Sequence, residues 1–178
     1  IEILKASGFN AIRTSHNPPS PAFLDACDRL GMLVIDEIFD HWKIAKNPQD
    51  YHRFFEAWWE TDLTAMIRQD RNHPSIIMWS IGNEINERVE DEGLKITRQL
   101  CDTVRRLDPT RPTTEALCEF WERQNRSWPD TARAFALLDV AGYNYQPKQY
   151  EPDHIQFPER IMVGSESFPR EALENWQQ

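Results

Sequence analysis

The chain has 178 residues, enough for one domain with a sizeable core, and its 40% hydrophobic and 28% charged residues are typical of globular proteins. Its net charge of −9 argues against a nucleic-acid partner, because binding to phosphates requires clustered lysine and arginine. No apolar run approaches the roughly 20 residues that span a bilayer, so we expect no membrane segment. Three widely spaced cysteines predict neither a disulfide framework nor a zinc site, and they do not fix a compartment.

Strand and helix signals alternate along the chain. In chain order we expect a helix end at 1–7, a strand at 9–13, a helix at 21–30, a strand at 32–35, a helix at 51–69, a strand at 76–81, a helix at 94–107, strands at 113–116, 137–142 and 161–163, and a helix from 171 to 176. Ser20 is a suitable cap for the helix that begins at Pro21, and Gly31 is a suitable end. Cys27 and Cys101 fall on apolar helix faces, which predicts buried thiols.

These strands predict a parallel sheet, because apolar runs without strict alternation indicate strands buried on both faces. Polar residues follow most of the strands, as in a (β/α)8 TIM barrel, whose site is drawn from many strand ends. A complete barrel of this kind has about 250 residues and eight strands, whereas six strands are predicted here. We therefore interpret residues 1–178 as a single catalytic-domain segment of a partial barrel, about strands 2 to 7, which alone would expose two apolar edges.

Two glutamates stand at the ends of predicted strands. Glu84 follows the strand at 76–81, and Glu166 follows the strand at 161–163. Carboxylates at the carboxyl ends of barrel strands lie where this fold places its active site, and a pair of them is what glycoside hydrolysis requires. The alternative is that each is a solvated acid at a strand end.

Four sequence runs resemble the catalytic barrel of the family 2 glycoside hydrolases, the group of β-galactosidases, β-glucuronidases and β-mannosidases. They are residues 8–18 (GFNAIRTSHNP), 27–37 (CDRLGMLVIDE), 70–84 (DRNHPSIIMWSIGNE) and 142–145 (GYNY). The region from 139 to 169 is most similar to β-galactosidase-type members. In this family the acid/base follows strand four and the nucleophile follows strand seven, which agrees with a segment that starts just before strand two. The resemblance also implies accessory β-sandwich domains elsewhere in the full-length chain.

The resemblance implies that Glu84 is the general acid/base and Glu166 the nucleophile, which forms a covalent glycosyl intermediate. The two carboxyls are then expected about 5–5.5 Å apart, and hydrolysis is expected to retain the anomeric configuration. It further implies that Asn83 donates to the sugar 2-hydroxyl, with a turn residue at the strand end as the alternative.

Five further residues are expected around this pair. By resemblance, Arg13 orients the nucleophile and lowers its pKa, while a structural ion pair with Glu37 is an alternative that does not exclude this role. Tyr145 is expected to donate its hydroxyl to the nucleophile, with a buried aromatic residue as the alternative. His16 is expected to contact sugar hydroxyls or to satisfy its loop, and Glu37, with Asp36, to bind sugar or to pair with Arg13.

We expect neither a metal nor another cofactor. The five histidines show no His-Glu-x-x-His or comparable ligand spacing. Some β-galactosidases of the family bind magnesium after strand three, but residues 38–43 (IFDHWK) do not match that register, although Asp40 and His41 remain candidates to line the pocket. His73, before a strand, is expected to be structural.

The sequence thus predicts a retaining exo-β-glycosidase, most similar to a β-galactosidase, that acts on a carbohydrate substrate. A β-glucuronidase or β-mannosidase, an endo-acting glycanase and a non-catalytic carbohydrate-binding barrel are the alternatives. The remaining domains of the full-length chain are the expected partners, and a homo-oligomer is compatible with all of these readings.

Overall fold

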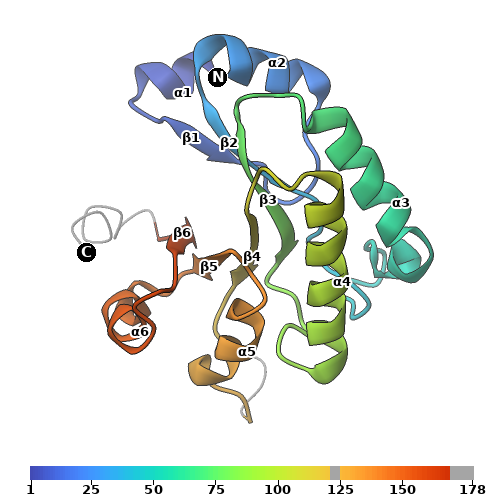
Figure 1. Cartoon of the computed structure of the whole chain (residues 1–178), viewed down its shortest axis with the longest axis vertical. Helices are drawn as coiled ribbons and strands as arrows, with labels where there is room; N and C mark the ends of the chain where they lie inside the picture. Colours follow the sequence, from blue (N-terminus) through green and yellow to red (C-terminus); the bar gives the residue numbers. More distant parts are fainter. Residues whose placement is uncertain (121–124, 169–178) are drawn as a thin grey trace.

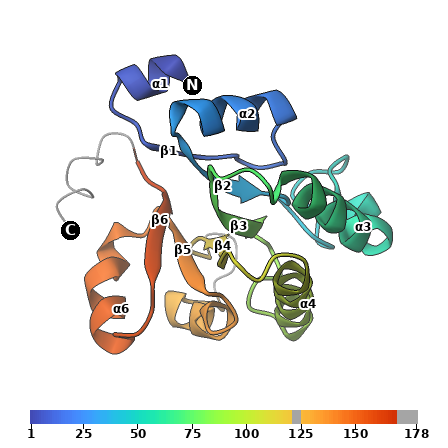
Figure 2. The same cartoon turned by 45° about the horizontal axis from the view of Figure 1, so that its top comes forward.

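The computed structural model describes residues 1–120 and 125–168. Its centre is a parallel sheet of six strands that lie side by side in sequence order. They are β1 (Ala11–Arg13), β2 (Leu33–Glu37), β3 (Ile76–Asn83), β4 (Thr113–Leu117), β5 (Val140–Asn144) and β6 (Met162–Glu166). The strands follow an arc (Figures 1 and 2), and β1 and β6 are the two edges of the described sheet. The partial TIM barrel predicted from the sequence is confirmed.

Helices lie along the outer side of this arc (Figure 1). The α-helices are α1 (Glu2–Ala6), α2 (Pro21–Leu30), α3 (His52–Asp70), α4 (Asp91–Leu107), α5 (Ala132–Phe135) and α6 (Tyr150–Gln156), and the two short 3₁₀ helices are η1 (Trp128–Thr131) and η2 (Pro147–Gln149). The predicted boundaries of α2 are confirmed, because the Ser20 hydroxyl accepts from the Phe23 amide and Gly31 adopts a left-handed φ of 67°. No helix in residues 1–120 and 125–168 has the length and apolar character needed to cross a membrane.

The larger core lies between β1–β3 and helices α2, α3 and α4. Trp42 and Trp79 are fully buried there, and each satisfies its indole N–H, Trp42 on the Ile81 carbonyl at 3.1 Å and Trp79 on Asp108 Oδ2 at 3.0 Å. Cys27 and Cys101 are buried thiols, as predicted, and Cys118 is buried as well.

A smaller core surrounds Tyr143, whose ring stacks on Phe135 and packs against Trp128. The strand predicted at 137–142 is shifted here, because Leu137 and Leu138 form the turn after α5 and hydrogen-bond to the carbonyls of Ala134 and Phe135. The short helices η1, α5, η2 and α6 were not predicted. The helix predicted at 171–176 lies outside the described residues.

Five of the strands end in a polar residue, and these residues lie at one end of the barrel. The last residues of β1, β2, β3, β5 and β6 are Arg13, Glu37, Asn83, Asn144 and Glu166. Because the strands are parallel, these five carboxyl ends lie at the same end of the sheet. His73, in contrast, precedes β3 and its Nδ1 lies 2.6 Å from Asp28 Oδ2, so it belongs to the opposite end.

Candidate active site

Arg13 links two carboxylates at the strand ends. Its Nη1 donates to Glu166 Oε1 at 2.6 Å, while Nε and Nη2 donate to Glu37 Oε2 and Oε1, both at 2.9 Å. Glu37 is fully buried, and its Oε2 also accepts from the Ser80 hydroxyl at 2.6 Å. The guanidinium fork is therefore fixed by Glu37 and presents its remaining edge to Glu166. Both readings of Arg13, an ion pair with Glu37 and a contact to Glu166, agree with this geometry.

Glu166 is a partly exposed carboxylate held by a cation and a phenol. Burial by itself raises its pKa, but hydrogen bonds from Tyr145 and Arg13 and the charge of Arg13 outweigh burial and leave the pKa below its usual range. The same bond to Glu166, together with burial, raises the pKa of Tyr145 to about 12. Glu166 is thus an ionised carboxylate and Tyr145 a neutral donor at neutral pH.

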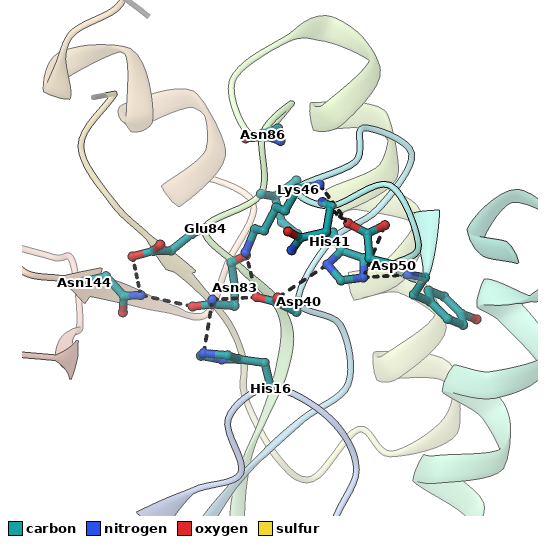
Figure 3. Close-up of polar contacts among 12 residues, drawn as sticks. His16, Asp40, His41, Lys46, Asp50, Asn83, Glu84, Asn86 and Asn144 are labelled. Carbon is teal, nitrogen blue, oxygen red and sulfur yellow. Dashed lines mark hydrogen bonds and ion pairs between the residues drawn. The ribbon is translucent and has the colours of Figure 1, made fainter. Parts of the chain in front are cut away.

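Glu84 has a different set of neighbours. Asn144 Nδ2 donates to Glu84 Oε1 at 3.0 Å and to Asn83 Oδ1 at 3.1 Å (Figure 3). Ser165 fixes the Asn144 amide, because its hydroxyl donates to Asn144 Oδ1 at 2.7 Å. A neutral amide, rather than a cation, therefore orients the Glu84 carboxyl.

Asn83 connects the donor of Glu166, Arg13, with the donor of Glu84, Asn144. Its Oδ1 accepts from Arg13 Nη2 at 2.8 Å as well as from Asn144, and its Nδ2 donates to Asp40 Oδ1 at 2.9 Å. The structure thus makes Asn83 part of a side-chain network and not simply a turn residue.

The backbone is strained at two residues of this cluster. Glu84 and Tyr145 have φ values of 45° and 57°, in the left-handed region that glycine normally occupies. Both backbone N–H groups are bonded, Glu84 N to the Ala116 carbonyl and Tyr145 N to the Glu166 carbonyl, each at 2.8 Å. Strain of this kind persists only where surrounding contacts impose it, and it is common at functional sites.

His16 lies at the entrance to the cluster. Its Nδ1 is 2.7 Å from Glu37 Oε1, and its Nε2 is 3.7 Å from Glu166 Oε1 and 3.4 Å from Asn83 Nδ2. Since its side chain remains about one-third exposed, the ring is available to a ligand while Glu37 fixes its orientation.

The structure therefore brings together all the candidate site residues predicted from the sequence: Glu84, Glu166, Arg13, His16, Asn83, Tyr145 and Glu37. The prediction that Asp36 binds sugar or pairs with Arg13 is wrong, because its carboxyl does not face the cluster. It is fully buried, and its carboxyl faces Thr14 and Asp70.

Two residues of the network were missed. Asn144 stands beside Tyr145 in the GYNY run, so its place at a strand end could have suggested it. Lys46 lies in the long β2–α3 connection, where residue spacing gives no such indication, yet its Nζ is 2.6 Å from Asp40 Oδ1.

Asp40 and His41 line a cavity of about 700 Å³ beside the cluster. Across residues 1–120 and 125–168, no group of three or more histidine, cysteine or carboxylate side chains is arranged to hold a metal ion.

Comparison with known proteins identifies the family. Residues 1–120 match the family described as "Glycosyl hydrolases family 2, TIM barrel domain". The chain belongs to glycosyl hydrolase family 2. The beta-galactosidase BoGH2A of Bacteroides ovatus is 39% identical over 94% of this chain and 23% of its own length. A putative beta-glucuronidase of Formosa agariphila is 46% identical over 62% of this chain and 10% of its own.

A solved structure supports the same assignment. A glycosyl hydrolase family 2 member from Bacteroides cellulosilyticus superposes with a TM-score of 0.92 and 48% identity, and the match covers 99% of this chain and 22% of that one. The chain thus spans less than a quarter of the length of these relatives. The family resemblance drawn from the four sequence runs is confirmed.

Proposed function

We propose that the protein is a retaining exo-β-glycosidase whose nucleophile is Glu166 and whose acid/base is Glu84. The observation that carries this proposal is the unequal environment of the two carboxyls. Glu166 accepts from Arg13 and Tyr145, whereas Glu84 accepts from the neutral amide of Asn144. Retaining hydrolysis needs one carboxylate kept ionised and one carboxyl able to exchange a proton, which is the division expected from these contacts.

In the first step, Glu166 attacks the anomeric carbon and forms a glycosyl ester, while Glu84 gives its proton to the departing glycosidic oxygen. Arg13 and Tyr145 hold the attacking carboxylate in one orientation, which lowers the entropic cost of reaching the transition state. Arg13 is itself fixed by Glu37, so the nucleophile has a rigid support.

In the second step, Glu84, now a carboxylate, takes a proton from a water molecule that attacks the same carbon. The bond to Glu166 breaks and the sugar leaves with its original anomeric configuration. Two inversions at one carbon give net retention.

Sugar recognition is assigned to Asn83 and His16. The amide of Asn83 lies between Arg13, Asn144 and Asp40, so its position relative to both carboxyls is fixed, as a contact to the sugar 2-hydroxyl requires. His16 is partly exposed beside it and is the better placed of the two to contact a hydroxyl at the pocket entrance.

For the substrate we propose terminal β-galactosides. The similarity to a named beta-galactosidase extends over 94% of the chain, whereas the similarity to a putative beta-glucuronidase extends over 62%. A β-glucuronidase of the same family is the second candidate, since a putative beta-glucuronidase is among the relatives, and a β-mannosidase is a further alternative implied by the family resemblance. We also propose that accessory β-sandwich domains lie elsewhere in the full-length chain.

The test is hydrolysis of nitrophenyl β-galactoside, β-glucuronide and β-mannoside by the full-length protein, with the anomer of the first product followed by NMR. We expect the galactoside to be the best substrate and the β-anomer to appear first. An α-anomer as first product would overturn the retaining mechanism, and no hydrolysis of any member would favour a non-catalytic carbohydrate-binding barrel.

A further inference from the structure

Lys46 reaches the base of the catalytic cluster from the β2–α3 connection. Its Nζ donates to Asp40 Oδ1 at 2.6 Å and to the backbone carbonyl of Asn83 at 2.9 Å (Figure 3). Its side chain is partly buried, with 21% exposed, so these contacts lie between the cluster and the solvent.

The contact of Lys46 with the Asn83 carbonyl fixes the peptide that leads into Glu84. The carbonyl of the Asn83–Glu84 peptide accepts from Lys46, and its N–H donates to the Ala116 carbonyl at 2.8 Å. The peptide plane is therefore held on both sides just before a residue with a φ of 45°. Because such a conformation needs external contacts to persist, Lys46 contributes to the direction in which the Glu84 side chain leaves the backbone.

The contact of Lys46 with Asp40 acts on the side chain of Asn83. Burial raises the pKa of Asp40, but hydrogen bonds from Lys46 and Asn83 and the charge of Lys46 bring it below its usual range. The ionised Asp40 accepts from Asn83 Nδ2, which turns Asn83 Oδ1 towards Asn144, the donor to Glu84. Lys46 thus influences Glu84 both through the backbone and through this row of side chains.

Contacts within the loop hold Lys46 in place. Asp50 Oδ2 accepts from the backbone N–H groups of Lys46 and Asn47, at 2.8 and 2.7 Å. Asn86 Nδ2 donates to the Ala45 carbonyl at 3.0 Å and ties this loop to the segment that follows Glu84.

We propose that Lys46 is a positioning residue for the acid/base Glu84: it sets the orientation of the Asn83–Glu84 peptide and of the Asn83 amide without touching the reacting atoms. This inference rests on the proposed role of Glu84. It predicts that loss of the ammonium group impairs proton delivery to the leaving group more than it impairs attack by Glu166.

The test uses the full-length protein with Lys46→Met, Lys46→Arg and the control Lys43→Met. Lys43 lies in the same loop, but its ammonium pairs with Glu92 at 3.0 Å on the surface. Each variant is assayed on a dinitrophenyl β-galactoside, whose leaving group needs no protonation, and on an alkyl β-galactoside, whose leaving group does. The ratio of the two kcat/KM values does not depend on the fraction of folded enzyme, so partial misfolding leaves the test valid.

We expect Lys46→Met to lose about 10²-fold in kcat/KM on the alkyl substrate, with less than about tenfold on the dinitrophenyl substrate. Lys46→Arg should recover part of the loss, and Lys43→Met should match the wild type on both. Equal losses on the two substrates, or none, would overturn the proposal.

Glu84→Ala, measured in the same assay, separates the two proposals. If Glu84→Ala discriminates between the substrates and Lys46→Met does not, only the role of Lys46 falls. If Glu84→Ala does not discriminate, the acid/base role and the inference that rests on it both fall.

Discussion

The ends of β3 and β6 carry the same functional group in different surroundings. Each presents a glutamate at the carboxyl end of a parallel strand. At β6, Arg13 places a cation 2.6 Å from Glu166, whereas at β3, Asn144 places an amide 3.0 Å from Glu84. The comparison shows that the fold places both glutamates at the same end of the sheet, while the charge of the nearest donor differs between them: a cation beside Glu166 and a neutral amide beside Glu84.

The difference begins in strand order. Arg13 and Glu166 lie on β1 and β6, the two edges of the described sheet, and the arc of the strands brings them together (Figure 2). Glu84 follows β3 and Asn144 ends β5, two strands separated only by β4. The contact that holds Glu166 therefore depends on the curvature of the described sheet, and the contact that holds Glu84 depends on nearby strands.

Replacing Glu166 should have the largest effect. We expect Glu166→Gln to lose several orders of magnitude in kcat, because no attacking carboxylate remains, while the exposed-site control Glu159→Gln stays near wild type. Glu166→Gly with added azide should form a glycosyl azide of inverted configuration, identified by NMR. Near-native turnover by Glu166→Gln would remove the nucleophile assignment.

Replacing Glu84 should have a large effect that depends on the substrate. Glu84→Ala should lose roughly 10²–10⁴-fold on alkyl β-galactosides, the usual contribution of general acid catalysis, and much less in the first step with activated aryl glycosides. Steady-state and pre-steady-state rates on both substrates measure this. A uniform loss would assign Glu84 to binding.

Replacing Tyr145 should have a moderate effect with a defined sign in pH. Tyr145 helps to hold the pKa of Glu166 down, so Tyr145→Phe should raise that pKa and move the acidic limb of the kcat/KM profile to higher pH. We expect a loss of about tenfold to a hundredfold at the optimum, the value of one hydrogen bond to a charged group. Tyr150→Phe on α6 is the control, and an unmoved acidic limb in Tyr145→Phe would separate Tyr145 from the nucleophile.

Asp36 sharpens the comparison, because it is a carboxyl at a strand end that faces another acid. Burial and the neighbouring Asp70 raise the pKa of Asp36 from 3.8 to about 8. The folded state therefore binds a proton that the unfolded state releases, so this group's contribution to stability is present below pH 3.8 and is lost as the pH rises towards 8.

We expect Asp36→Asn to flatten the fall in melting temperature between about pH 5 and about pH 8, with activity changed little, while the exposed-site variant Asp25→Asn leaves the slope unchanged. Melting curves of the full-length protein across this range measure the effect. An unchanged slope in Asp36→Asn would show that another group binds the proton.

The sequence allowed the strands and most site residues to be predicted, because Arg13, Glu37, Asn83 and Glu166 each end a short apolar run. It did not allow the start of β5 to be located, since Leu137 and Leu138 are as apolar as strand residues but close a turn against Ala134 and Phe135.

The contacts of Asn144 and Lys46 were also missed. The donors of Asn144 reach Asn83 and Glu84, about 60 residues away in the chain, and the ammonium of Lys46 reaches the Asn83 carbonyl from the middle of a loop. Such contacts depend on the tertiary structure and cannot be predicted from the spacing of residues along the chain.

The most direct test of the division between the two carboxyls is to trap the intermediate. The full-length protein is incubated with a dinitrophenyl β-galactoside in which fluorine replaces the C2 hydroxyl, and the labelled residue is located by peptide mass spectrometry. Our account predicts one fluorosugar per active site, on the peptide that contains Glu166, and none in Glu166→Gln. A label on Glu84, or turnover of this reagent with no covalent adduct, would contradict it.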